Sequence, residues 1–460
     1  MEKLFKLKEN NTTVRTEIIA GVTTFFASVF TIIVMPNMVA GGNAELAQAV
    51  FFATAIGSVI GTLCMAFIAN LPFVVAPAMG LGAFFAITAM PMMAMITGIS
   101  EYDRIAQYQM ALTLVIIAGA LFMISTFGGI REKVINGFPP NIKAALGTGI
   151  GMFIASLGLR QAGIVVGHPT NLVQMIDFGT WATNSHNIMG AIFSLLGFFL
   201  MAGLYFKKVK GAFLIGILFV TALAYIFGYS TVPEGFSFDL GSQARNFVEI
   251  SFFRADFGIF TAENIGTTIG PLFALILAFT LVNLLDSLGV IFGVCKSADM
   301  VNEKGEVTGL SKGLLSDAIG TLVGGILGSP TNTTGATSST GIAAGGRTGL
   351  TALTSAILYI SVLVLAPFVA LLPGIATAPA LMFIGVFMMS QVKSVDFSDL
   401  TEAVPAFLTI IMMPLTSSVA NGIALGLASY VLMKLITGRV KEITPVSAII
   451  AGLFALQYIL

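Results

Sequence analysis

The stretch GSPTNTTGATSSTGIAAGG (residues 328–346) gathers hydroxyl, amide and glycine residues inside a chain that is otherwise strongly apolar. Of the 460 residues, 56% are hydrophobic and only 10% are charged, and the mean hydropathy is +0.96. Soluble domains carry roughly 25% charged residues, so this composition indicates a polytopic membrane protein. The polar stretch is therefore expected at membrane depth, where no bulk water is available to its backbone.

Composition also narrows the function classes. The net charge is zero, which leaves no electrostatic argument for a nucleic-acid partner. Neither Cys64 and Cys295 nor His168 and His186 have the spacing of a metal or redox motif, so we expect no metal site and no cofactor. No nucleophile and base set lies within reach of the apolar segments, so the chain is predicted not to be an enzyme. The charged segment 1–17 runs straight into the first apolar stretch and does not resemble a cleavable signal peptide.

Hydropathy divides the chain into fourteen candidate spans, because a crossing helix needs roughly 17–25 mostly apolar residues. They lie near 16–38, 46–69, 72–92, 105–127, 140–160, 187–206, 211–228, 267–294, 312–328, 330–346, 349–372, 375–391, 402–418 and 420–437. With a cytoplasmic N-terminus, 18 of the 22 Lys and Arg residues fall on the cytoplasmic side, among them Arg131, Lys133 and Lys304. Such asymmetry is what the positive-inside rule requires. The last apolar stretch, 444–460, either crosses or lies at the interface.

Fourteen spans divide into two sevens of opposite orientation, the arrangement of an inverted repeat. Spans 3 and 10, around 71–86 and 328–346, are both short and interrupted by Pro and Gly. We predict that 328–335 is extended and precedes a half-helix, with open backbone N–H groups near Ala336 and Thr337 directed to the midplane. The stretch before Gly80 is predicted to do the same in the other half. In the alternative reading, the Ser and Thr hydroxyls only bond back to carbonyls of their own helix.

Asp286, in LILAFTLVNLLDSLGVIFGV (275–294), is an acidic residue well inside a long apolar span. An intramembrane carboxylate is costly and marks a functional site by default, so Asp286 is predicted to take up a proton or to accept a substrate N–H. A structural hydrogen bond to a neighbouring helix is the alternative. Asn283, three residues earlier, shares its helix face and is placed to orient it. Glu17 and Asp317 lie nearer the ends of their spans, and Asp317 is predicted at the cytoplasmic mouth of span 9.

Several blocks of the chain resemble one known family. They include APAMGLGAFFA (76–86), GIREKVINGFPPNIKAALGTGIGMFIASLGLRQAGIVV (129–166), TGIAAGGRTGLTAL (340–353) and LTEAVPAFLTIIMMPLTSSVANGIALG (400–426). From about residue 5 to 440 the chain is similar to the azaguanine-type purine permeases, the adenine/guanine/hypoxanthine branch of the nucleobase–ascorbate transporter (xanthine/uracil permease) superfamily.

The resemblance implies an all-α, uracil-permease-like fold of seven plus seven inverted spans, with short extended segments in spans 3 and 10. Spans 1–4 (residues 1–128) and 8–11 (267–372) would form a core domain. Spans 5–7 (129–228) and spans 12–14 with the short C-terminal apolar segment (373–460) would form a gate domain. An external linker (229–266) would join the two repeats.

The resemblance also implies a function. The expected protein is a secondary active transporter that imports a nucleobase, by family default a purine, across the cytoplasmic (inner) membrane. It would use proton symport, H⁺ being favoured over Na⁺, and an elevator-type movement of the core. Its partners would be a nucleobase-like small molecule, the coupling ion and the lipid bilayer, and the resemblance allows a homodimer.

The family's site positions carry over one by one. Its span-8 carboxylate matches Asp286, which is also the expected proton-coupling residue, and the acid before it is Asn283 here. Its span-10 glutamate and its span-3 asparagine are replaced by Thr337 and Gly82, which is expected to open space at Gly82 and Gly335. The same fold carrying a modified base or a non-nucleobase solute is therefore the alternative function. The predicted substrate contacts are Asp286, Asn283, Thr334, Ala336, Thr337, Ser338, Gly82 and Phe84, with Phe84 or Phe85 as a stacking face.

Overall fold

The computed structural model describes residues 2–459 except 101–102, 127–136, 169–171, 233–238, 262–264, 299, 301–306, 308 and 370. The predicted domain boundary at 128–129, and Arg131, Lys133 and Lys304, lie outside the described residues. Among those described, eleven helical segments are long and apolar enough to cross a bilayer, and α10 and α18 are shorter apolar helices. The chain is thus a mostly helical, multi-pass membrane protein, as predicted.

The helices and strands follow one another along the chain. The first half contains α1 (Glu2–Phe5), α2 (Val14–Ala40), α3 (Ala44–Cys64), η1 (Met65–Ala69), β1 (Val75–Pro77), α4 (Met79–Phe84), η2 (Phe85–Ala89), α5 (Met90–Thr97), α6 (Arg104–Ser125), α8 (Pro140–Gln161), β2 (Val165–His168), β3 (Leu172–Met175), η3 (Phe178–Thr180), α9 (Trp181–Phe206) and α10 (Ala212–Ile226). The second half contains α11 (Leu240–Asn246), η4 (Phe247–Ser251), η5 (Gly258–Thr261), α12 (Ile265–Ser297), α13 (Leu310–Leu327), β4 (Asn332–Thr334), α14 (Ser338–Ala343), α15 (Gly349–Val362), η6 (Leu363–Leu365), α16 (Ala366–Val369), α17 (Gly374–Met389), η7 (Ser390–Ser394), α18 (Leu400–Thr416), α19 (Val419–Ile436), η8 (Val440–Glu442) and α20 (Pro445–Ile459).

Local sequence explains where these helices begin. Thr13, Asn43 and Asp103 each accept an N–H from the first turn of α2, α3 and α6, which satisfies donors that a helix start leaves unpaired. At the other end of α2, Gly41 adopts a left-handed conformation with φ of 57°, which glycine adopts at little cost.

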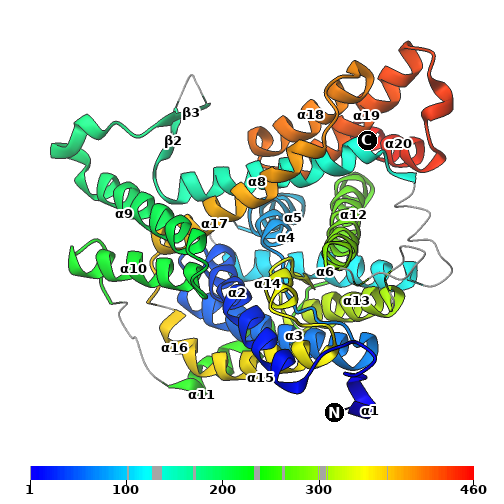
Figure 1. Cartoon of the computed structure of the whole chain (residues 1–460). Helices are drawn as coiled ribbons and strands as arrows, with labels where there is room; N and C mark the ends of the chain where they lie inside the picture. The colour runs from blue at the N-terminus through cyan, green and yellow to red at the C-terminus, as the bar shows by residue number, and fades with distance from the viewer. Residues whose placement is uncertain are drawn as a thin grey trace.

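The two interrupted segments meet in the middle of the fold. β1 and β4 pair antiparallel, with Val75 opposite Thr334 and Pro77 opposite Asn332. α4 and α14 follow these strands and lie near the centre of the molecule (Figure 1). The predicted extended segments are therefore present, and the ladder satisfies backbone groups that lipid could not satisfy.

The long helices pack in two sets. In one, α13 packs against α3 and α6, and α15 packs against α2 and α3. In the other, α8 packs against α17 and α18, α18 against α19, and α9 against α10 and α17 (Figure 1). Glycines allow close approach in both sets, since a Cβ on Gly341 would lie 2.6 Å from the Ala20 carbonyl oxygen.

The segment predicted as an external linker is packed against helices where it is described. The side chains of Gln109 and Thr113, on α6, donate to the carbonyls of Ile250 (2.9 Å) and Asp256 (2.6 Å). The N–H of Phe253 donates to the carbonyl of Ile326 at the end of α13. Residues 240–261 therefore brace α6 and α13.

Candidate functional site

The start of α14 offers open backbone donors. The N–H groups of Ser338, Ser339 and Thr340 bond to carbonyls three residues earlier, at 3.0–3.1 Å. No acceptor among the described residues reaches the N–H groups of Ala336 and Thr337. Ala336 is exposed and Thr337 is half-buried. This geometry agrees with the predicted position of the open donors.

Two of the predicted substrate contacts hold the loop itself. The buried Ser338 hydroxyl accepts the N–H of Val74 (3.0 Å), and the N–H of Gly335 donates to the carbonyl of Val74 (2.9 Å). The buried Thr334 donates to Asp317 through its N–H (2.5 Å) and its hydroxyl (2.8 Å). These two hydroxyls fix the chain between β4 and α14.

Asp286 lies on α12 and is half-buried. No donor among the described residues reaches its carboxylate. Val290 and Val294 follow it one and two turns later on α12. A bound molecule or a proton is thus free to engage Asp286.

Asp317, predicted at a cytoplasmic mouth, is instead fully buried beside the ladder. Its carboxylate accepts the hydroxyl of Ser287 (2.5 Å), the hydroxyl of Thr333 (3.1 and 3.2 Å) and both donors of Thr334. These donors come from α12 and β4, so one carboxylate on α13 ties together the three elements around Asp286. The sequence around Asp317 did not predict these hydrogen bonds, because β4 reaches Asp317 only after the chain reverses direction at the end of α13.

Asn283 is buried and turned toward α13. Its amide nitrogen donates to the Thr321 hydroxyl (3.1 Å), which in turn donates to the carbonyl of Asn332 (2.7 Å). The amide oxygen of Asn283 has no partner among the residues that the structure describes. Asn283 therefore links α12 to α13 and β4 and retains one free acceptor.

The space expected at Gly82 is not there. A Cβ on Gly82 would lie 2.0 Å from Cε and 2.4 Å from Sδ of Met35, which is fully buried on α2. At Gly335, a Cβ would lie 3.2 Å from the Thr337 hydroxyl. The expectation of extra room at Gly82 is wrong, because a thioether from another helix fills it.

Phe84 is also fully buried, and its ring packs against Phe279 of α12 with ring centres 5.3 Å apart. Phe85 is buried against Tyr108 and Phe279. Phe84 belongs to the packing of α4 against α12, and Phe85, in η2, packs against α6 and α12, so neither ring presents an open face.

Glu17, a second carboxylate expected near a span end, is fully buried as well. It accepts the N–H groups of Arg347 (2.8 Å), Thr348 (3.3 Å) and Thr351 (3.2 Å) and the Thr351 hydroxyl (2.6 Å). Glu17 thereby caps the start of α15 from α2.

A cavity of about 600 Å³ lies at the Glu17 end of α2. It is lined by Tyr205 of α9, Val294 of α12, Ala298 just after α12, Ser339, Thr340, Ile342 and Ala343 of α14, and Arg347. Ser339 and Thr340 directly follow Thr337 and Ser338 along the chain. The cavity therefore lies beside the start of α14.

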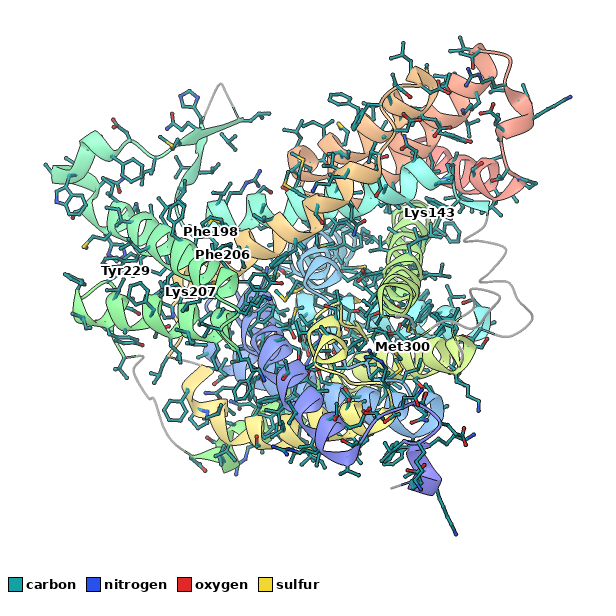
Figure 2. The ribbon with its side chains drawn as sticks, in the orientation of Figure 1. Lys143, Phe198, Phe206, Lys207, Tyr229 and Met300 are labelled. Atoms are coloured by element: carbon teal, nitrogen blue, oxygen red, sulfur yellow. The ribbon has the colours of Figure 1, made fainter. Side chains whose placement is uncertain are left out.

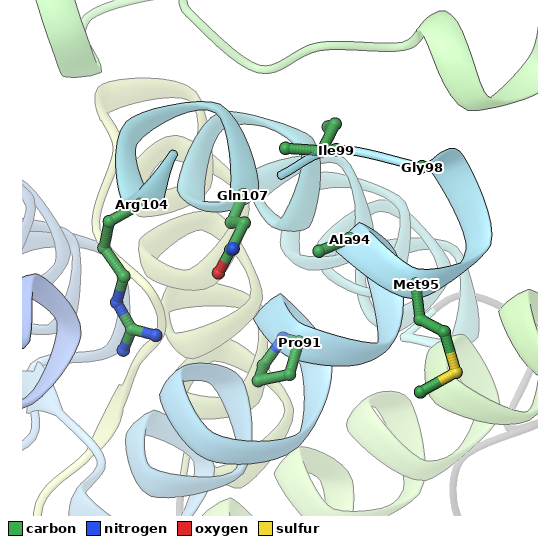
Figure 3. Close-up of a pocket in the computed structure, with 7 residues that line it drawn as sticks. All are labelled: Pro91, Ala94, Met95, Gly98, Ile99, Arg104 and Gln107. Atoms are coloured by element: carbon green, nitrogen blue, oxygen red, sulfur yellow. The ribbon is translucent and has the colours of Figure 1, made fainter. Parts of the chain in front are cut away.

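A second cavity of about 440 Å³ lies at the opposite end of α2, where Arg104 donates to the carbonyl of Val39 (2.9 Å). Pro91, Ala94, Met95, Gly98, Ile99, Arg104 and Gln107 line it (Figure 3). Arg104 also donates to the carbonyl of Ala86 (3.3 Å). This cavity separates the ends of α5 and α6.

No cluster of three or more His, Cys, Asp or Glu side chains with metal-binding geometry occurs among the described residues. The candidate site instead consists of a carboxylate that no described donor reaches, on α12, and of backbone N–H groups and hydroxyls at the start of α14. Such a set can bind a small polar molecule that has both donors and acceptors.

Comparisons with known proteins agree on the family and the fold. The model of the permease family, named for xanthine and uracil permeases, matches residues 15–425. The chain is 38% identical to the guanine/hypoxanthine permease PbuO of Bacillus subtilis over 99% of both chains. It is 36% identical to the adenine permease AdeQ of Escherichia coli over 100% of this chain and 96% of that one.

Two solved transporters share the fold. The transmembrane domain of a cyanobacterial bicarbonate transporter, BicA, has a TM-score of 0.61 at 16% identity, covering 88% of this chain and 97% of that one. The murine anion transporter Slc26a9 in its inward-facing state has a TM-score of 0.61 at 11% identity, covering 92% and 68%.

Proposed function

Because this chain belongs to the xanthine/uracil permease family, we propose that it is a secondary active transporter that carries a purine nucleobase across the cytoplasmic membrane. The observation that carries the proposal is Asp286, a carboxylate on α12 that no donor among the described residues reaches. Purine bases present N–H groups that such an acceptor binds, and their carbonyls or ring nitrogens suit open N–H donors like those of Ala336 and Thr337. Relatives named as guanine/hypoxanthine and adenine permeases support this substrate class.

The transport mechanism we propose is proton symport with an elevator-type movement. In this proposal the chain crosses fourteen times as a seven-plus-seven inverted repeat, with the N-terminus in the cytoplasm. The set of helices around α2, α3, α12 and α13 is the moving core, and the set around α8, α17, α18 and α19 is the static gate. Asp286 binds the coupling proton or the substrate N–H, and Asp317 holds α12 and β4 in place around it.

A different substrate in the same fold is the second candidate. Thr337 offers only a hydroxyl where an acidic side chain would bind a base strongly, and the buried Met35 fills the space beside Gly82. A modified base or a non-nucleobase solute in the same fold is therefore the alternative substrate.

Uptake into proteoliposomes tests the proposal. We expect the full-length protein to accumulate labelled adenine, guanine or hypoxanthine when the outside is acidic, and to lose accumulation when a protonophore is added. Stabilisation of purified protein by the same bases gives an independent readout, about 2.7 kcal/mol at a hundredfold excess over Kd. Failure of all three bases in both assays would exclude purine transport, and accumulation driven by a sodium gradient alone would exclude proton symport.

A further inference from the structure

The cavity at the Glu17 end of α2 has walls from both helix sets. α12 supplies Val294 and α14 supplies Ser339 and Thr340, whereas Tyr205 is the lining residue from α9. Figure 2 marks this end of α9 by Phe206 and Lys207, which directly follow Tyr205. Because Ser339 and Thr340 directly follow the start of α14, the cavity adjoins the candidate site and has an aromatic side chain in its wall.

The ring of Tyr205 is held in place by other aromatic rings. Its centre lies 5.6 Å from that of Phe383 at 75° and 4.9 Å from that of Phe387 at 58°. Nevertheless 44% of Tyr205 is exposed. A braced aromatic ring loses little conformational freedom when a ligand stacks on it, since its orientation is already set.

The opposite wall is polar but not acidic. Ser339 and Thr340 supply hydroxyls, and Arg347 supplies a guanidinium whose Nη1 already donates to the carbonyls of Ile342 and Gly346 (both 2.8 Å). The described lining residues include no carboxylate. Its volume of about 600 Å³ is ample for a bicyclic base with water around it.

We propose that Tyr205 is the stacking partner of a planar heteroaromatic base in a second subsite, which the substrate occupies on its way between Asp286 and the cytoplasm. The proposal rests on the proposed function and on the proposed orientation, in which the N-terminus lies in the cytoplasm. The base lies against the ring of Tyr205, and its polar edge faces Ser339, Thr340 and Arg347. Stacking is tolerant of ring substituents, so this subsite retains the base while Asp286 distinguishes among bases.

The consequence is an asymmetry between the two faces of the membrane. Loss of base–aromatic stacking weakens binding by roughly 5- to 150-fold, and the lower end applies to a ring that is only partly covered. Replacement of Tyr205 by Leu should therefore raise the half-saturating concentration at the cytoplasmic face about five- to tenfold. The external face should change less than twofold, since the ring lies on the other side of the site.

Exchange assays in proteoliposomes sorted by orientation test this, with labelled hypoxanthine, adenine and guanine as probes. The variants are Tyr205→Leu, Tyr205→Phe, which keeps the ring, and Phe199→Leu, which removes a ring that is 66% exposed on the same helix but outside the cavity. We expect Phe199→Leu to match the wild type at both faces, and Tyr205→Phe to lose less affinity at the cytoplasmic face than Tyr205→Leu does. Thermal unfolding of each variant shows whether the fold is kept.

The outcomes separate the subsite from the proposed function. If the wild type exchanges none of the bases, both proposals fail. If it exchanges a base and Tyr205→Leu matches it at both faces, only the subsite fails. Equal losses at both faces, or a loss in Tyr205→Phe as large as in Tyr205→Leu, also overturn the stacking role.

Discussion

Exchange of a carboxylate for an amide should have opposite consequences at the two aspartates near the ladder. In Asp286→Asn the side chain keeps its shape, and no donor among the described residues loses a charged acceptor. We therefore expect the free energy of unfolding to stay within about 0.5 kcal/mol of the wild type. Binding should suffer instead, because a hydrogen bond to a charged group contributes about 1.5–3 kcal/mol. That range corresponds to a loss of roughly 12- to 160-fold in affinity for the transported base.

The same exchange at Asp317 removes a charge that Ser287, Thr333 and Thr334 all donate to. An amide accepts at one end only, so at least one of these buried donors loses its acceptor, at a cost of about 1–3 kcal/mol. The remaining bonds also weaken, because their acceptor is now neutral. We expect Asp317→Asn to lower the free energy of unfolding by about 2–4 kcal/mol.

Thermal unfolding in detergent can be followed by a thiol-reactive dye, because the chain has two free cysteines, Cys64 and Cys295. Uptake of labelled bases into cells that express each variant supplies the second measurement. Asp286→Asn should unfold like the wild type and fail to transport, and Asp317→Asn should unfold at a lower temperature. The reasoning is refuted if Asp317→Asn keeps the wild-type stability, or if Asp286→Asn is the less stable of the two.

Two further predictions concern packing and acid stability. Gly341→Ala should lower the free energy of unfolding by about 1–3 kcal/mol, because the added Cβ would lie 2.6 Å from the backbone oxygen of Ala20. Gly203→Ala is the control, since its Cβ would meet nothing within 4 Å and thermal unfolding should not change. Equal effects of the two substitutions would contradict this packing argument. Hydrogen bonds from the backbone N–H and the hydroxyl of Thr401, and to a lesser extent the charge of Arg439, lower the pKa of Asp399 to about 2. The ionised Asp399 therefore stabilises the folded protein above about pH 4, and this stabilisation is lost as the pH falls toward 2. Asp399→Asn should make the unfolding temperature less dependent on pH between these values. An unchanged pH dependence would contradict this role of Asp399.

Both broken segments could be predicted from the sequence for physical reasons. The run 328–335 combines hydroxyl and amide side chains with Pro330, and 71–79 contains Pro72 and Pro77, so neither stretch can form a lipid-facing helix. The structure pairs them as β1 and β4. The positions of the open donors at Ala336 and Thr337 followed from the same argument.

The partners of side chains could not be predicted in this way. Hydropathy placed Asp317 near the end of a span, but its partners Thr333 and Thr334 reach it only after the chain turns back at Gly328. Likewise the sequence around Gly82 did not predict the contact with Met35, which lies more than forty residues earlier and fills the expected space. Hydropathy reports which segments a bilayer accepts, whereas these contacts depend on how helices cross.

The electrostatic cost of the site differs between its two aspartates. The buried Asp317 is compensated by the protein itself, so its cost is the same whatever occupies the site. No donor among the described residues compensates the half-buried Asp286, and a carboxylate carried through a state without water costs at least several kcal/mol when it is uncompensated. A proton or a substrate N–H removes that cost. We infer that the core helices do not move across the membrane while Asp286 is ionised and the site is empty. Movement would then require a bound proton or substrate at Asp286, which couples it to the ligand.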